Sequence, residues 1–201
     1  MSNVTRGFFG RSRPTEPAGR VPPGQYLTSD FPVLSAGPTP HIEPADWNLS
    51  VSGEVDGPVS WTWDEMLALP QEELTVDIHC VTKWSKLDTT WRGVSLDTLL
   101  ADVDTAAEYV MVHSYGGYTT NLPLTDLLDG KAWVAHTYGG EPLDPEHGGR
   151  ARLVVPHLYF WKSAKWVREL ELMNEDELGF WEGYGYHSYG DPWQEQRYAG
   201  D

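Results

Sequence analysis

The strongest constraint on the fold is an alternation of apolar and polar side chains in "ELTVDIHC", residues 73–80. Leu74, Val76, Ile78 and Cys80 have one parity, and the polar residues between them have the other. Because successive side chains of a strand point to opposite faces, this pattern predicts a half-buried strand. Cys80, the only cysteine of the chain, is therefore expected to face the apolar side at the end of that strand.

Turn-forming residues predict that the other strands are short. The chain has 20 glycines, 15 prolines, 10 tryptophans and 10 tyrosines among its 201 residues, a composition typical of many short strands joined by turns. Thr62 and Glu65 have the spacing of a capping box, so a short helix is expected over 62–69. Similar patterns predict a half-buried strand in 47–55, a turn and short helix in 91–103, a strand and Gly-Gly turn in 108–124, a hairpin around Gly139-Gly140, and strands in 150–156 and 165–173.

These elements predict an α+β fold, with mixed β-sheets and short peripheral helices. The length suits a single domain, expected over residues 26–201, after an N-terminal arm rich in Pro, Gly and Arg over residues 1–25. The tail, 175–201, is too aromatic for a disordered acidic segment and is expected to pack on the body of the domain.

The charge excludes several classes of partner. A formal net charge of −16 repels nucleic acid and anionic membranes, so neither is expected to be a main partner. No apolar run approaches the ~20 residues of a membrane helix, so no membrane insertion is expected. The first 20 residues lack the apolar core of a signal peptide and a twin arginine, which predicts a cytoplasmic protein. One cysteine also excludes an internal disulfide.

Two interpretations of the role of Cys80 are open. A free cysteine usually behaves as a small buried hydrophobe. However, Lys83, Lys86 and Arg92 follow closely, and positive charge favours the thiolate, which can act as a nucleophile or as a soft metal ligand. None of the seven histidines belongs to a recognisable catalytic signature, and the ligand spacings of zinc sites and the glycine motifs of nucleotide sites are missing.

A second feature lies about seventy residues further along the chain. Residues 150–168 contain five basic side chains and no acidic one, although the chain as a whole is acidic. Such a segment is either a solvated face or the site of an anionic ligand such as a phosphate. A thiolate that holds a metal whose organic ligand bears a phosphate would account for both features.

Three segments carry a resemblance to a known family. The segment "DIHCVTKWSKLDTTWRGVSL" resembles the molybdenum-cysteine segment of the sulfite oxidase superfamily, in particular its short single-domain bacterial and archaeal members. The segment "RLVVPHLYFWKSAKWVRELEL" resembles the part of the family in which an Arg and a Lys meet the cofactor phosphate. "GFWEGYGYHSYGDPWQEQRY" is similar to the tail of the same subgroup.

The resemblance implies a sulfite oxidase-type fold that binds a molybdenum–molybdopterin cofactor. By position, Cys80 would be the molybdenum ligand and a catalytic residue. Lys83, Lys86 and Arg92 are candidates by their charge to attract an oxyanion or a sulfoxide oxygen, and Lys83 and Arg92 are taken as the further catalytic candidates. The implied cofactor-binding residues are Ser29, Pro32, Val33, Cys80, Ser114, His147, Arg152, Ser163, Ala164 and Lys165. The family pattern has Asn where this chain has Ser29 and His147, and the chain has no counterpart of the larger members' dimerisation and haem domains.

The implied activity is a two-electron oxo transfer on a small oxo donor or acceptor, such as sulfite or a sulfoxide. Since the chain has no haem, flavin or iron–sulfur motif, a separate redox protein is expected to exchange the electrons, and a monomer is expected. Two alternatives remain open: a hydrolase or transferase with Cys80 as nucleophile, and a non-catalytic module that binds molybdopterin. His79 would be an awkward base for Cys80, because neighbours on a strand face opposite ways.

Overall fold

The computed structural model describes residues 19–201, and most of the predicted arm therefore lies outside the described residues. Its last part, from residue 19 to 25, packs on the strands around Cys80. Arg20 there donates to the carboxylates of Asp77 and Asp88, each at 2.6 Å. This part of the arm is thus tied to the body of the protein.

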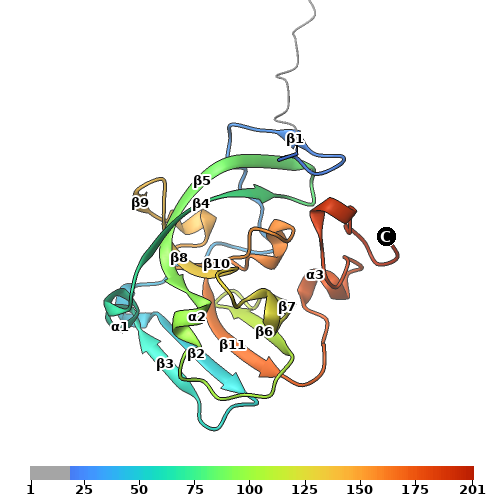
Figure 1. Ribbon diagram of the computed structural model, residues 1–201. Helices are drawn as coiled ribbons and strands as arrows, with labels where there is room; N and C mark the ends of the chain where they lie inside the picture. The colour runs from blue at the N-terminus through green and yellow to red at the C-terminus, as the bar shows by residue number, and fades with distance from the viewer. Residues whose placement is uncertain (1–18) are drawn as a thin grey trace, which may run out of the picture.

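The first sheet has six strands and contains the strand that leads to Cys80 (Figure 1). Its main path runs β1-β5-β8-β10, with β4 paired to β5 and β9 paired to β8. Only the β1–β5 pair is parallel, so the sheet is mixed. Its strands are β1 (Tyr26–Leu27), β4 (Glu72–His79), β5 (Trp84–Ser95), β8 (Trp133–Tyr138), β9 (Glu141–Pro142) and β10 (Arg152–Val154).

The second sheet has five strands in the order β3-β2-β11-β6-β7. It is also mixed, because β11 pairs with β2 in parallel and with β6 in the antiparallel sense. Its strands are β2 (Asn48–Gly53), β3 (Val59–Thr62), β6 (Tyr109–Ser114), β7 (Thr119–Pro123) and β11 (Val167–Met173). The predicted α+β class with mixed sheets is confirmed, as are the strands expected in 47–55, 73–80, 108–124, 150–156 and 165–173 and the hairpin at Gly139-Gly140.

The helices are short and lie at the edges of the sheets, as expected (Figure 1). They are α1 (Trp63–Ala68), α2 (Leu96–Leu99) and α3 (Phe180–Gly183), with five 3₁₀ turns, η1 (Pro44–Asp46), η2 (Leu124–Asp126), η3 (Pro145–His147), η4 (Phe160–Lys162) and η5 (Pro192–Gln194). The capping box of Thr62 and Glu65 forms at the start of α1. No helix in the described part of the chain combines the length and apolar character that a bilayer crossing requires.

The turn predicted around residues 91–93 is wrong. The 12-residue strand β5 continues through Arg92 and Gly93, and only the short helix after it forms as predicted. Gly93 serves close strand packing, because a Cβ there would lie 2.2 Å from the carbonyl oxygen of Val134 on β8. A glycine in a strand pattern can mark such an approach of two backbones as well as a turn.

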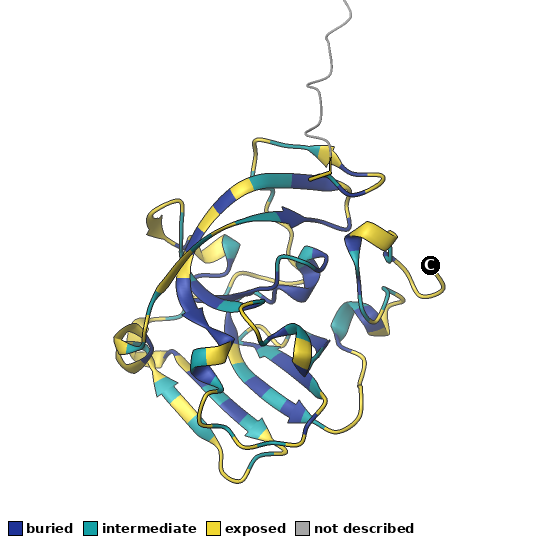
Figure 2. Ribbon diagram, viewed as in Figure 1, coloured by how far each residue is buried: buried dark blue, intermediate teal, exposed yellow. Residues whose placement is uncertain are grey.

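Buried apolar side chains form two clusters, and the buried residues follow the inner faces of the two sheets (Figure 2). The larger cluster joins the second sheet to β8, β10 and α2. In the smaller cluster, Cys80 packs among large aromatic side chains, including Trp84, Trp91, Tyr159 and Trp161. The predicted inward direction of Cys80 is therefore confirmed, with 6% of the residue exposed.

The tail packs on the body of the protein, as predicted. Tyr186 and Tyr198 pair in an isolated β-bridge, and Arg197 donates to the carbonyl of Pro23 at 3.3 Å and to the hydroxyl of Tyr159. These contacts bring the last residues of the chain beside the segment that precedes β1.

Candidate functional site

Cys80 lies in the tight turn that joins β4 to β5. The turn closes by two backbone hydrogen bonds, from the Cys80 amide to the Trp84 carbonyl and from the Lys83 amide to the Cys80 carbonyl, each 2.9 Å long. Lys83 has a φ of 76°, the left-handed conformation that such turns require. The side-chain amide of Gln25 donates to the Cys80 carbonyl at 3.1 Å, so the residues before β1 hold the same turn.

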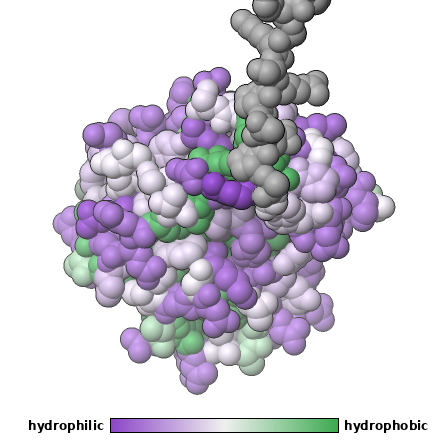
Figure 3. Space-filling model, turned by 45° about the horizontal axis from the view of Figure 1, so that its top comes forward, coloured by the Kyte–Doolittle hydropathy of each residue, from purple (hydrophilic) through white to green (hydrophobic). Residues whose placement is uncertain are grey.

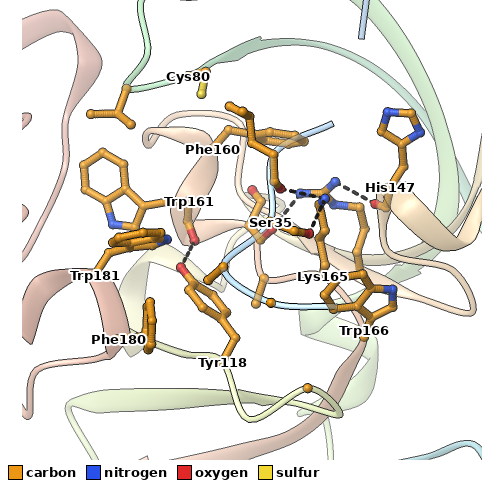
Figure 4. Close-up of a pocket in the computed structure, with 18 of the residues that line it drawn as sticks. Ser35, Cys80, Tyr118, His147, Phe160, Trp161, Lys165, Trp166, Phe180 and Trp181 are labelled. Atoms are coloured by element: carbon orange, nitrogen blue, oxygen red, sulfur yellow. Dashed lines mark hydrogen bonds between the residues drawn. The ribbon is translucent and has the colours of Figure 1, made fainter. Parts of the chain in front are cut away.

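The sulfur of Cys80 borders a cavity of about 420 Å³ (Figure 4). This size is within the usual range of ligand pockets, about 300–1,000 Å³. Five parts of the chain that are distant in sequence line it: residues 31–38, the Cys80 turn, residues 116–118, the stretch from 147 to 166, and the start of the tail at 180–186.

One wall of the cavity contains a buried cation, Arg152. The residue is 1% exposed, and its guanidinium donates to the carbonyls of His147 at 2.8 Å and Ser163 at 2.7 Å. It also lies 4.0 Å from the ring centre of Phe160. Burial lowers the pKa of Arg152 to about 9, because the charged guanidinium loses its hydration.

Lys165 supplies a second cation to the same wall. Its ammonium donates to the carbonyls of Glu146 at 2.6 Å and Leu34 at 2.8 Å and to the hydroxyl of Ser35 at 3.2 Å. Burial lowers the pKa of Lys165 to about 8, and the nearby charge of Arg152 lowers it further. Within residues 19–201, no carboxylate lies within 4.0 Å of either cation. Arg152 and Lys165 can therefore bind an anionic group of a ligand.

The side of the cavity opposite Lys165 and His147 is aromatic (Figure 4). Trp161 and Trp181 each lie close to Tyr186, with ring centres 5.1 and 5.2 Å apart, respectively. Phe180 packs against Trp181 at 5.0 Å, and Tyr118 donates its hydroxyl proton to the Trp161 carbonyl at 2.7 Å. The cavity thus has a cationic end and an aromatic end, and Cys80 borders it between them.

Most of the predicted cofactor residues converge on this cavity. Pro32, Cys80, His147, Arg152, Ser163, Ala164 and Lys165 line it. Ser29, Val33 and Ser114 do not, although the carbonyl of Ser29 accepts from Lys86 at 2.5 Å and Ser114 ends β6, just before Gly116 and Gly117 of the lining. The roles of these three residues stay predictions.

Lys83 and Arg92 lie outside the cavity lining. Both are exposed, Lys83 in the turn and Arg92 on β5. The geometry gives no support to a catalytic role for either residue, and that role stays a prediction. A long charged side chain at the edge of a strand is normally solvated, and here the neighbouring tryptophans occupy the inner face.

No sequence pattern identified the aromatic lining residues or Thr82 as part of the site. The Thr82 hydroxyl donates to the Cys80 sulfur at 3.2 Å. The aromatic residues come from positions 31, 84 and 118 and from the segments 160–166 and 180–186, whose convergence no local pattern reveals. The aromatic excess of the tail is the one sequence feature that pointed to these residues. It predicted that the tail packs on the domain, but not that its side chains line the cavity.

The alternative function, a hydrolase or transferase with Cys80 as the nucleophile, would need a general base beside the thiol. Burial raises the pKa of the Cys80 thiol, which disfavours the free thiolate. The His79 ring meets Ser85 at 2.9 Å, and that of His147 stacks on Phe31 at 4.0 Å and meets its carbonyl at 3.0 Å. Among the described residues, no histidine is within hydrogen-bond distance of the Cys80 sulfur.

Comparison with known proteins gives the family. The model of the oxidoreductase molybdopterin-binding domain matches residues 36–181. The chain belongs to this family. It is a molybdenum-dependent oxidoreductase of the sulfite oxidase superfamily, whose cofactor is a molybdenum-bound molybdopterin.

Relatives of this molybdopterin-binding family cover the chain to different extents. An uncharacterized oxidoreductase of Bacillus subtilis, YuiH, is 48% identical over 96% of the chain and 100% of its own length. The catalytic subunit of a protein-methionine-sulfoxide reductase of Campylobacter jejuni is 26% identical over 72% of the chain, which covers 55% of that protein. Mouse mitochondrial sulfite oxidase is 24% identical over 86% of the chain, which covers 39% of that enzyme.

A solved structure supports the fold. The sulfane dehydrogenase SoxCD of Paracoccus pantotrophus superimposes with a TM-score of 0.62, at 23% identity, over 68% of the chain and 40% of that protein. The sulfite oxidase-type fold predicted from the sequence is confirmed.

The residues present fit the family's cofactor. Molybdopterin bears a phosphate, and Arg152 and Lys165 give the cavity two cations without a carboxylate partner. Among residues 19–201, no three His, Cys, Asp or Glu side chains converge on a metal position. A metal beside Cys80 would therefore need most of its ligands from the cofactor, and the dithiolene sulfurs of the pterin meet that need.

Proposed function

We propose that this protein catalyses two-electron oxo transfer on a small molecule, with Cys80 as the protein's ligand to molybdenum. The observation that carries the proposal is that one cavity has a thiol beside it and two uncompensated cations in one wall. The thiol suits a soft metal and the cations suit a phosphate, so the two groups match the two ends of one cofactor. When bound, that cofactor supplies the oxo-transfer and redox chemistry.

The residues around the cavity have distinct tasks in this proposal. Arg152 and Lys165 hold the phosphate by charge-assisted hydrogen bonds, while their contacts to backbone carbonyls fix their positions. The Val155 amide donates a hydrogen bond to the Ser163 hydroxyl at 2.9 Å, so the backbone fixes the Ser163 side chain. The turn at Cys80 holds the buried sulfur, and Thr82 donates a hydrogen bond to it.

The substrate and the electron route belong to the same proposal. A small oxo donor or acceptor, such as a sulfoxide or sulfite, would enter beside Cys80, and a separate redox protein would exchange two electrons. The reductase subunits and sulfite oxidase among the relatives act on sulfur–oxygen compounds according to their names, which supports this substrate class. A cytoplasmic location and a monomeric state also stay predictions, which cell fractionation and light scattering would test.

Metal content tests the role of Cys80. We expect about one molybdenum per chain in protein produced with adequate cofactor supply, and a loss of that metal in Cys80→Ala protein that keeps its near-ultraviolet circular dichroism. Full molybdenum in a folded Cys80→Ala protein would contradict the ligand assignment. Metal-free wild-type protein with a thiol-dependent activity would favour the hydrolase alternative instead.

The amount of cofactor that the protein retains tests whether the wall with Arg152 and Lys165 binds the cofactor phosphate. Lys165→Met should lower the bound pterin, measured by fluorescence of the extracted and oxidised cofactor. Arg168→Met is the matched control, because Arg168 belongs to the same basic segment but is exposed and does not line the cavity. Equal pterin loss in the two variants would show that general charge, not a phosphate contact, retains the cofactor. Bound cofactor without oxo transfer on a broad panel would favour the binding module.

A further inference from the structure

The two ends of the cavity differ in the substrate charge that they can accept. Among residues 19–201, Arg152 and Lys165 are the only Arg, Lys, Asp or Glu side chains in the lining of this cavity, and both are at the end assigned to the phosphate. The aromatic end contains Trp161, Trp181 and Tyr186 with no charged group in the lining. If the cofactor phosphate lies on the cations, a substrate at the other end of the cavity would meet this aromatic wall.

The Lys162 ammonium lies behind the aromatic end, but each of its N–H groups already donates to a partner. Lys162 is fully buried and forms an ion pair with Glu182 at 2.7 Å. Its ammonium also donates to the carbonyls of Asn121 at 2.7 Å and Ser188 at 2.5 Å. These three partners use the three N–H groups of the lysine, so it cannot serve as an oxyanion partner.

We propose that the aromatic end selects an uncharged oxo compound with apolar or aromatic substituents, such as a sulfoxide, and disfavours a small oxyanion such as sulfite. This inference rests on the proposed function and names its substrate class. A dianion moved from water to an apolar wall without a hydrogen-bonded cation loses its hydration with no compensation. The chain's net charge of −16 further disfavours the approach of an anion.

Aromatic faces, by contrast, fit a neutral substrate. They offer large apolar contact area and the offset or edge-on packing that aromatic groups prefer. In the direction of reduction, the S–O bond breaks, sulfur keeps the electron pair as a thioether, and oxygen leaves as water with two protons and two electrons. The two electrons come from the separate redox protein of the proposed function, or from a reduced dye in an assay.

The tail contributes to this end of the cavity beyond the segment that the family model matches. The family match ends at residue 181, whereas Tyr186 lies beyond it and still lines the cavity. Trp181 and Tyr186 stack with ring planes 18° apart, and Glu182 between them is held in the core by Thr120 at 2.8 Å and Trp161 at 2.9 Å. The buried carboxylate thus sets the position of both rings.

The test compares substrates on molybdenum-loaded protein. Methyl phenyl sulfoxide would be reduced with a reduced viologen dye, and sulfite would be oxidised with ferricyanide. We expect kcat/KM for the sulfoxide to exceed that for sulfite by at least about tenfold. Measurable oxo transfer with sulfite as the better substrate would overturn this inference and leave the proposed function intact. Loaded protein that transfers oxygen with neither compound, nor with a wider panel, would instead count against the proposed function.

A variant series then locates the selectivity. Trp181→Leu should raise KM for methyl phenyl sulfoxide by about tenfold or more, with a smaller change in kcat, because an apolar contact to the substrate is lost. Trp193→Leu is the control, since Trp193 is in the same tail but does not line the cavity. Tyr186→Leu gives a second, independent readout if Trp181→Leu does not fold. An unchanged KM in folded, molybdenum-loaded Trp181→Leu and Tyr186→Leu proteins would contradict the assignment of this wall to the substrate.

Discussion

At the scale of single residues, Thr82 shows how a hydroxyl can act on the proposed metal ligand. It donates to the Cys80 sulfur at 3.2 Å from two residues along the same turn. A hydrogen bond to a ligand sulfur draws electron density from it and fixes its direction. Thr82 therefore belongs to the proposed site, although it contacts the ligand and not the metal.

Thr82→Val is expected to lower oxo-transfer activity by about tenfold or more, as is usual when the hydrogen-bond partner of a metal ligand is removed. Its molybdenum content should fall less than that of Cys80→Ala protein. Turnover per bound molybdenum and the reduction potential from a redox titration measure the effect. Thr82→Ser is the control, since it retains the hydroxyl, and a Thr82→Val protein with wild-type turnover and potential would contradict the role.

The lowered pKa of Lys165 predicts that anion binding by the cofactor-free protein depends on pH. Its pKa is lowered to about 8, so the ammonium is fully present below that pH and is lost as the pH rises through it. Above that pH, an anion can bind only with uptake of a proton, and the affinity should fall by up to about tenfold per pH unit. The binding of inorganic phosphate, followed by calorimetry from about pH 7.5 to 9, checks this direction.

Lys165→Arg provides the comparison, because an arginine keeps its charge over that range. We expect its phosphate affinity to vary less with pH than that of the wild-type protein. Parallel pH profiles for the two proteins would show that another group controls the binding.

At the scale of elements, local sequence patterns account for the helix α1. Thr62 accepts from the Glu65 amide at 3.4 Å, and Glu65 accepts from the Thr62 amide at 2.8 Å. These reciprocal bonds satisfy backbone groups that a helix start leaves unpaired. The pattern could be recognised from sequence because all of its members lie within one turn.

Thr62→Ala should lower the free energy of unfolding by about 1 kcal/mol through the loss of this cap. Chemical denaturation of the two proteins measures it. Ser60→Ala is the matched control, since Ser60 is exposed on β3, just before the cap, and should change stability little. Equal effects of the two substitutions would show that the cap contributes nothing specific.

Strand β5 shows the limit of local patterns. Arg92 and Gly93 predicted a turn, yet both lie within the strand, because β8 approaches too closely there for any side chain larger than that of glycine. The requirement comes from a strand about forty residues away in the sequence. No pattern within β5 itself could distinguish a glycine that is needed for a turn from one that is needed for close packing.

At the scale of the whole molecule, the pair Lys162–Glu182 joins the tail to the body beneath the aromatic end of the cavity. Both side chains are fully buried. A buried ion pair contributes little against a well-packed apolar pair, but the removal of one member leaves an uncompensated charge. The pair therefore makes the position of the tail depend on the core.

Glu182→Leu is expected to lower the free energy of unfolding by about 3–5 kcal/mol, because it leaves the Lys162 ammonium buried without its counter-ion. The double variant Lys162→Met/Glu182→Leu should recover part of this loss. Denaturation measures the stability of both proteins, and limited proteolysis reports whether the tail is released. A single variant as stable as the wild-type protein would contradict the role of the pair.

The surface of the molecule agrees with its acidic composition. On the face shown in Figure 3, hydrophilic residues predominate and the hydrophobic areas are small and separate. The basic residues of 150–168 have diverse surroundings: Arg152 and Lys162 are buried, Lys165 lines the cavity, and Arg168 is exposed. A count of charges along the chain could indicate an anion site but could not assign its members.

The sequence by itself determined the strands, the capped helix and the inward direction of Cys80, and its resemblance to a family predicted cofactor-binding residues, most of which line the cavity. Alternation, capping and turn chemistry act over a few residues, so a short stretch is enough to specify them. Only the tertiary structure decided that Lys83 and Arg92 lie outside the cavity lining, that Lys162 forms a buried ion pair with Glu182, and that the tail supplies an aromatic wall. These outcomes depend on which distant segments meet, because burial and pairing of a side chain are set by all of its neighbours.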